Sequence, residues 1–124
     1  MQLEQLKDLV VDTLDDMKAR DIAVMDVRGK TAVTDYMIVA SGTSDRHVKA
    51  IAETIAYRAK EAGEPPIGTE GVDDGEWALV DLNGVVVHVM LPKVRDFYNL
   101  ERLWSAPVLV SDTPPRQSVA AGSF

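Results

Sequence analysis

A β-hairpin is predicted by residues 77–91, which read WALVDLNGVVVHVML. Two apolar runs flank Asn83 and Gly84, a pair that tolerates positive φ and therefore favours a two-residue type I′ turn. Leu82 then faces Val85, and the register continues outward until Trp77 lies opposite Met90. The stretch thus supplies two antiparallel strands.

Alternation along these strands separates two faces of the hairpin. One face is uniformly aliphatic and is expected to pack against helices; it comprises Ala78, Val80, Leu82, Val85, Val87, Val89 and Leu91. The other mixes bulky apolar and ionisable side chains, namely Trp77, Leu79, Asp81, Val86, His88 and Met90. Because ionisable groups are costly to bury unless they are paired, this second face is expected to meet a polar neighbour or a partner.

Two amphipathic helices are predicted before the hairpin. In the first eighteen or so residues, apolar side chains recur from Leu3 to Met17 at helical spacing. A second helix begins at Thr43 and Ser44, whose side chains can accept hydrogen bonds from free backbone amides. Its apolar stripe runs over residues 48–62, and glycine and prolines then end it.

Short apolar runs predict further strands at residues 22–27 and 36–40, both in the interior of the sheet, and a shorter one at 67–70. After the hairpin, a helix beginning near Val94 would place Phe97, Leu100, Glu101 and Trp104 on one side. This order predicts an α/β fold with a mixed β-sheet of about five strands and flanking helices. We expect one domain over residues 1–104 and a disordered tail over 105–124.

Composition and charge exclude several classes of function. The chain has no cysteine, which excludes disulfides, thiol catalysis and cysteine-ligated zinc. No apolar run is long enough to cross a membrane and the N-terminus is acidic, so a cytoplasmic protein is expected. The net charge of −7 has the wrong sign for binding phosphates through counterion release, so direct, sequence-specific binding of nucleic acid is not expected. Residues 61–92 contain acids but no Lys or Arg, which would attract a basic partner or simply form a solvated loop.

The two histidines give weak signals for catalysis or metal binding. His47 has Ile51 at i+4, so its spacing does not support a metal site. His88 lies diagonally from Asp81 in the predicted register and can form a hydrogen-bonded pair with it. Without a serine in a strained turn, this pair favours a role in orientation or at an interface over a catalytic triad.

Two further patterns have ordinary structural interpretations. The turn at residues 41–44 resembles a phosphate cradle, but it lacks a P-loop lysine and Asp45 competes for the position, which favours helix capping. Asp73, Asp74 and Glu76, with Asp81 nearby, suggest a magnesium site, yet their glycine-rich setting favours a surface turn. Neither pattern predicts a cofactor.

Aromatic residues gather beside the acidic stretch. Trp77, Phe97, Tyr98 and Trp104 all lie within residues 77–104. Trp and Tyr are common anchors of protein interfaces, and an acidic rim around them would select a basic protein. Part of the group, Phe97 and one tryptophan, is expected to be buried in the core.

Several blocks, from the first helix to Trp104, resemble the ribosomal silencing factor family, also called the Iojap family. They are Asp35-Tyr-Met-Ile-Val-Ala-Ser-Gly42, Ser44-Asp-Arg-His-Val48, Glu70-Gly71, Trp77-Ala-Leu-Val-Asp81, Val86-Val-His-Val89 and Arg95-Asp-Phe-Tyr-Asn-Leu-Glu-Arg-Leu-Trp104. Two positions depart from the family pattern: the Asn83-Gly84 turn, and His47 in place of a common Gln.

The resemblance implies a binding protein without a reaction or a cofactor. Its implied partner is the large ribosomal subunit, through large-subunit ribosomal protein number fourteen, and its implied effect is to block subunit joining and repress translation when nutrients are scarce. It also implies a nucleotidyltransferase-like fold without the catalytic residues. Such enzymes carry an Asp-x-Asp pair about ten residues after the Gly-Ser turn, whereas residues 51–55 here offer only Glu53.

We expect the second hairpin face and the last helix to bind the partner through Trp77, Leu79, Asp81, His88, Arg95, Tyr98, Glu101 and Trp104. Trp77, Leu79 and Trp104 would supply apolar area, and Asp81 and Glu101 would pair with basic groups. Arg95 would instead brace Glu101 or the hairpin. The alternatives are a nucleotidyltransferase-like enzyme and a generic dimerisation module, and a homodimer of the free protein is possible.

Overall fold

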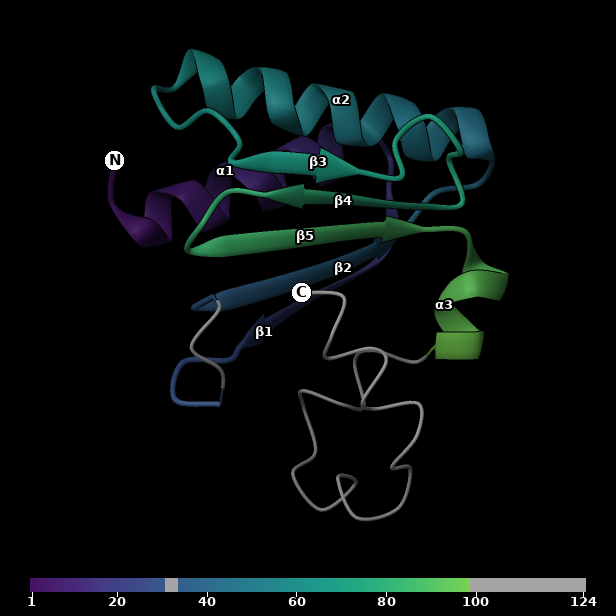
Figure 1. Cartoon of the computed structure of the whole chain (residues 1–124), viewed down its shortest axis with the longest axis horizontal. Coiled ribbons are helices and arrows are strands. Elements are labelled where there is room, and N and C mark those ends of the chain that lie inside the picture. Colours follow the sequence, from purple (N-terminus) through teal and green to yellow (C-terminus); the bar gives the residue numbers. More distant parts are fainter. Residues whose placement is uncertain (31–33, 99–124) are drawn as a thin grey trace.

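The chain forms a five-stranded mixed sheet with helices on its faces (Figure 1). The computed structural model describes residues 1–30 and 34–98. Its elements are α1 (Leu3–Asp16), β1 (Arg20–Asp26), β2 (Tyr36–Ser41), α2 (Asp45–Glu61), β3 (Gly68–Glu70), β4 (Trp77–Asp81), β5 (Val85–Met90) and α3 (Pro92–Tyr98). The strand order is β1-β2-β5-β4-β3, and β2 and β5 pair in parallel while the other neighbours are antiparallel. The predicted fold class is therefore confirmed.

The hairpin has the predicted register but a different turn. Trp77 lies opposite Met90 at its open end. Of the two turn residues only Asn83 has a positive φ, 74°, so the type I′ prediction, which needs both, was wrong. The backbone of Gly84 instead serves β2: its carbonyl accepts hydrogen bonds from the amides of Asp35 and Tyr36, at 3.1 and 3.0 Å. The turn is thereby attached to the start of the neighbouring strand.

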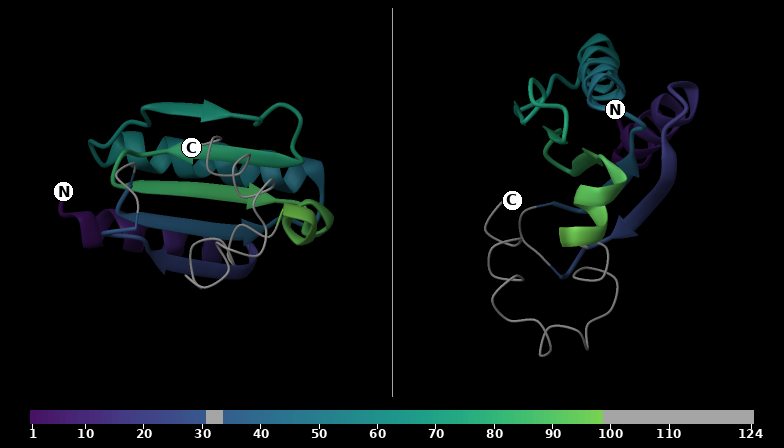
Figure 2. Two further views of the ribbon diagram at one scale, coloured as in Figure 1. Left: turned by 60° about the horizontal axis from the view of Figure 1, so that its bottom comes forward. Right: turned by 90° about the vertical axis from the view of Figure 1, so that its right-hand side faces the viewer.

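The two long helices cover one face of the sheet, and both lie behind it in the left view of Figure 2. The face of the hairpin that was predicted to be aliphatic packs against them, as expected. Its buried residues are Ala78, Val80, Leu82, Val85, Val87 and Val89, with Leu91 partly buried beside them. From the helices, Leu14, Ile51 and Ile55 enter the same core. In the segment 51–55, where the enzymes would carry their Asp-x-Asp pair, Ile51 and Ile55 are fully buried and pack in the core.

The start of α2 matches the sequence prediction. Ser44 is its N-cap, and the Ser44 hydroxyl accepts a hydrogen bond from the backbone N–H of His47 at 3.1 Å. Asp45 follows in the first turn, where a negative charge is favourable. Capping therefore accounts for the serine of the turn at residues 41–44.

One strand prediction was wrong in its position. β1 was expected in the interior of the sheet, but it is an edge strand with mostly exposed or half-buried residues. β2 lies between β1 and β5, so within residues 1–30 and 34–98 the one strand that pairs with β1 is β2. Its register also shifts between Arg20 and Ala23. β3 forms the opposite edge, and all its residues are exposed.

Several predictions fall outside the described residues. Leu100, Glu101, Trp104, the tail over 105–124 and the boundary at 104 all lie beyond Tyr98, where the description ends. α3 itself begins at Pro92, two residues before the predicted start. In the parts of the chain that are described, no helix is long and apolar enough to span a membrane.

Candidate functional site

The second face of the sheet carries a smaller apolar cluster. Its buried members come from β1, β2, β5 and the loop after β1, and they are Met25, Val27, Met37, Val39 and Met90. Trp77 of β4 and Val94 of α3 pack against this cluster and remain partly exposed. Figure 1 shows α3 beside the end of β5, so the short helix and the open end of the hairpin meet here.

Aromatic rings connect the hairpin to α3. The centroid of the Trp77 ring lies 4.7 Å from that of Tyr98 and 5.8 Å from that of His88. Phe97 adds an edge-on contact with Tyr98 at 5.0 Å. We call Trp77, His88, Phe97 and Tyr98 the aromatic cluster.

The aromatic cluster is open to solvent on its α3 side. Phe97 is 63% exposed and Tyr98 is 39% exposed, so the prediction that Phe97 belongs to the core was wrong. Helical periodicity indicated which residues share a side with Phe97, but in the described structure that side does not bury it. A large exposed aromatic beside a half-buried tryptophan is typical of a protein-binding surface.

His88 lies at the bottom of the cluster and has no exposed surface. Its Nδ1 accepts a hydrogen bond from the indole Nε1–H of Trp77 at 2.8 Å. The predicted pair with Asp81 was therefore wrong. Asp81 instead accepts a hydrogen bond from the backbone N–H of Asn83 at 2.9 Å and so closes the hairpin turn. Burial lowers the pKa of His88 from 6.5 to about 3, which keeps the imidazole neutral.

Arg95 fixes α3 against the sheet. Its side chain is buried, and its Nη1 donates a hydrogen bond to the hydroxyl of Ser41 at 3.0 Å. The backbone amides of Val94 and Arg95 both donate to the carbonyl of Leu91 at 3.0 Å, which starts the helix directly after β5. The bracing role expected for Arg95 is thus directed at the end of β2, while the expected pairing with Glu101 lies outside the described residues.

Sequence reasoning missed Ser41 as part of this site. The signal was present, because Ser41 ends a strand whose residues are all buried. A buried hydroxyl requires a hydrogen-bond partner, so a long donor from elsewhere in the chain was to be expected. Which donor supplies it depends on the tertiary structure.

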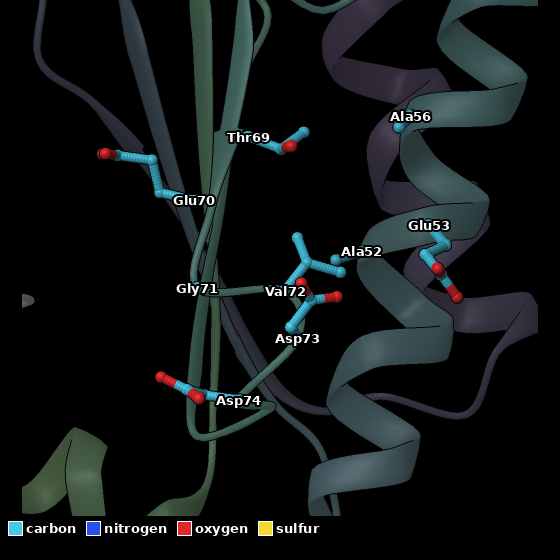
Figure 3. A pocket seen from close by; sticks show the side chains of 9 residues that line it. All are labelled: Ala52, Glu53, Ala56, Thr69, Glu70, Gly71, Val72, Asp73 and Asp74. Carbon is cyan, nitrogen blue, oxygen red and sulfur yellow. The ribbon is translucent and has the colours of Figure 1, made fainter.

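The acidic residues after α2 line an open groove of about 550 Å³ between α2 and the segment from β3 to Asp74. Figure 3 shows Asp73 turned toward α2, whereas the side chains of Glu70 and Asp74 point away from it. Lys49 lies 3.9 Å from Asp73, a long and exposed ion pair. Within residues 1–30 and 34–98, no group of three or more His, Cys, Asp or Glu side chains is arranged to hold a metal ion.

Comparison with known proteins identifies similar sequences and a similar structure. The sequence model of the family described as "Ribosomal silencing factor during starvation" matches residues 1–123. "Ribosomal silencing factor RsfS" of Chromobacterium violaceum is 46% identical over 104 residues, which cover 84% of this chain and 85% of that protein. The protein of the same name from Zymomonas mobilis is 43% identical over 116 residues, covering 94% and 86%. A crystal structure of a Chromobacterium violaceum protein superposes with a TM-score of 0.82 at 46% identity, covering 84% of this chain and 87% of that one.

Proposed function

Because this chain belongs to the ribosomal silencing factor family, we propose that it binds the large-subunit ribosomal protein number fourteen and sterically prevents the large and small subunits from associating. The family is one of non-catalytic, ribosome-binding regulators of translation. The bound domain occupies space that the small subunit needs, and translation falls when nutrients are limiting. The site of action is the cytoplasm.

The aromatic cluster is the observation that supports this proposal best. The rings of Trp77 and Tyr98 lie in tilted contact, and Phe97 and Tyr98 both expose much of their surface. Burying such rings in a partner releases water from apolar surface, which is the main source of affinity at interface hot spots. Leu79 is half-buried on the same face of β4 as Trp77 and extends this surface along the strand.

Charge gives the surface a preference for a basic partner. Asp73, Asp74 and Glu76 are exposed directly before Trp77, and residues 61–92 contain no Lys or Arg. An acidic rim beside an apolar centre attracts a basic protein surface and disfavours an acidic one. Asp81 is half-buried, and its Oδ1 accepts a hydrogen bond from the backbone N–H of Asn83 in the hairpin turn. Asp81 is therefore proposed to stabilise the turn and also to contribute negative charge to the acidic rim.

The proposed site residues thus fall into two groups. Trp77, Leu79, Asp81 and Tyr98, with Glu101 and Trp104, are proposed to contact the partner. His88 and Arg95 are buried and are proposed to support the surface from below.

Co-sedimentation with isolated large ribosomal subunits tests the proposal. The wild-type chain is expected to pellet with large subunits and to reduce their association with added small subunits. Trp77→Ala is expected to weaken both effects. Tyr57→Ala is the control, because it removes an aromatic side chain that is 63% exposed on α2, outside the proposed surface. No binding by the wild type would refute the function, and equal losses in both variants would refute the surface.

A further inference from the structure

His88 is a polar residue in a strand where every residue is buried. An aliphatic side chain at this position would bury its surface without the desolvation cost that a polar imidazole incurs. The same desolvation lowers the pKa of His88. What distinguishes His88 from a leucine here must therefore be a contact that only a polar group can make.

The described residues supply such a contact, the hydrogen bond from Trp77 Nε1–H to His88 Nδ1, at 2.8 Å. An indole N–H is a donor only, so Nδ1 must be the unprotonated, accepting nitrogen of a neutral imidazole. Leu79 lies opposite His88 in the ladder, so Trp77, two residues earlier, reaches His88 along the diagonal of the same face. The bond fixes both the tilt and the direction of the indole plane.

The indole is also held from α3. Tyr98 lies against it at 4.7 Å with an interplanar angle of 49°, while His88 meets it at 5.8 Å with the same angle. Trp77 is therefore held between a buried hydrogen-bond acceptor and a half-exposed ring. An interface side chain that is ordered before binding loses less conformational entropy when the complex forms.

We propose that His88 is a positioning residue for partner binding: it holds the Trp77 indole in the orientation that the partner recognises, without touching the partner itself. This inference rests on the proposed function, in which Trp77 contacts the large subunit. The affinity for the large subunit then depends on the acceptor atom Nδ1 of His88, and not only on the presence of the Trp77 indole.

Three substitutions isolate the acceptor atom. His88→Leu removes it and introduces an apolar side chain of similar bulk, whereas His88→Asn restores an acceptor, because Asn Oδ1 takes the place of His Nδ1. Trp77→Phe removes the donor and keeps an aromatic ring. Each variant is first checked for folding by circular dichroism. Proton NMR then records the indole N–H resonance of Trp77, which is identified by its loss in Trp77→Phe.

The indole resonance is expected to move upfield in His88→Leu, as a hydrogen bond is lost, and to return toward its wild-type position in His88→Asn. Binding to large subunits is expected to weaken about tenfold in His88→Leu, the scale of one hydrogen bond, and to recover in His88→Asn. In the Trp77→Phe background, which has no N–H to position, His88→Leu is expected to cause no further loss. A purely structural role would predict a further loss there.

The outcomes separate this inference from the proposed function. If wild type and His88→Leu bind large subunits equally while the resonance shifts, the positioning role is refuted and the function stands. If His88→Leu weakens binding as much in the Trp77→Phe background as in wild type, the positioning role is also refuted. If the wild type fails to bind, the proposed function is refuted and the positioning role with it.

Discussion

Arg95 and Ser41, which are 54 positions apart in the chain, share a buried hydrogen bond of 3.0 Å that joins α3 to the end of β2. Arg95→Ala leaves the Ser41 hydroxyl without this donor and removes a buried side chain from α3, the helix that carries Phe97 and Tyr98. We expect a loss of about 2 kcal/mol in the free energy of unfolding and weaker binding to large subunits. Urea denaturation measures the first effect. Lys93→Ala, an exposed neighbour in α3, should change neither.

Acid should destabilise the protein through His88. The pKa of this residue is about 3 in the folded protein, against 6.5 for an ordinary histidine, so between these values the unfolded chain binds a proton that the folded chain does not. The contribution of the neutral His88 to the free energy of unfolding is fully present above pH 6.5 and is lost as the pH falls toward 3. The slope should approach about 1.4 kcal/mol per pH unit.

Urea denaturation at a series of pH values between about 4.5 and 6.5 measures this slope. This window is chosen because most carboxylates titrate at lower pH. His88→Leu is the control, because it keeps every other titratable group, including His47. Equal slopes in wild type and His88→Leu would contradict the buried, neutral state of the imidazole.

Gly71→Ala should destabilise the chain more than Gly63→Ala. Both glycines have positive φ, 71° and 87°, so both substitutions carry backbone strain. Only at Gly71 would the added Cβ meet another atom, the carbonyl oxygen of Trp77 at 2.1 Å, while nothing lies within 4 Å at Gly63. We expect about 1 kcal/mol at Gly63 and about 3 kcal/mol at Gly71, measured as shifts in the denaturation midpoint. Equal effects would contradict the close approach of the loop to β4.

Lys18→Gly should stabilise the protein. Lys18 follows the C-cap of α1 and has a φ of 61°, a conformation that glycine adopts without strain. The expected gain is about 1 kcal/mol in the free energy of unfolding, seen as a higher melting temperature. Lys60→Gly, within α2, should instead cost about 1 kcal/mol. A loss at both positions would show that the Lys18 side chain contributes more than its backbone costs.

Phe97→Ser should leave the fold intact and weaken binding to large subunits. The ring is 63% exposed and contacts Tyr98 edge-on, so its removal should cost less than about 1 kcal/mol of stability. If it contacts the partner, the affinity should fall at least about tenfold, as for an interface hot spot. Unchanged affinity with an unchanged fold would place Phe97 outside the binding surface.

Local sequence signals were sufficient for the hairpin and the capped helix, since Asn83 and Gly84, strand alternation and the Ser44 cap act over a few residues. The position of β1 was not predictable in this way. Whether a strand is central or at an edge depends on the pairing of β2 with β5, and nothing within residues 22–27 encodes it. The exposure of Phe97 was not predictable for the same reason. Helical periodicity indicates on which side of the helix a residue lies, but not whether another element covers that side.

The partner of His88 was mispredicted for a geometric reason. Trp77 and Asp81 are both diagonal neighbours of His88 in a register that was predicted correctly. In the structure Asp81 Oδ1 accepts from the backbone N–H of Asn83, while the Trp77 indole N–H donates to His88 Nδ1. Register alone identifies both diagonal neighbours and does not tell which of the two side chains bonds to His88.

The strand order also determines when the protein can fold. Among the strands of residues 1–30 and 34–98, β5 is the last to be synthesised, yet it lies in the middle of the sheet, between β2 and β4 (Figure 1). Its parallel partner begins at Tyr36, which pairs with Val85 far along the chain, and such distant contacts form slowly. A nascent chain must therefore extend past Met90 and clear the exit tunnel before its sheet can close. The sheet accordingly cannot form step by step from its N-terminal strands, because its central strand is supplied after β1 to β4 have left the ribosome.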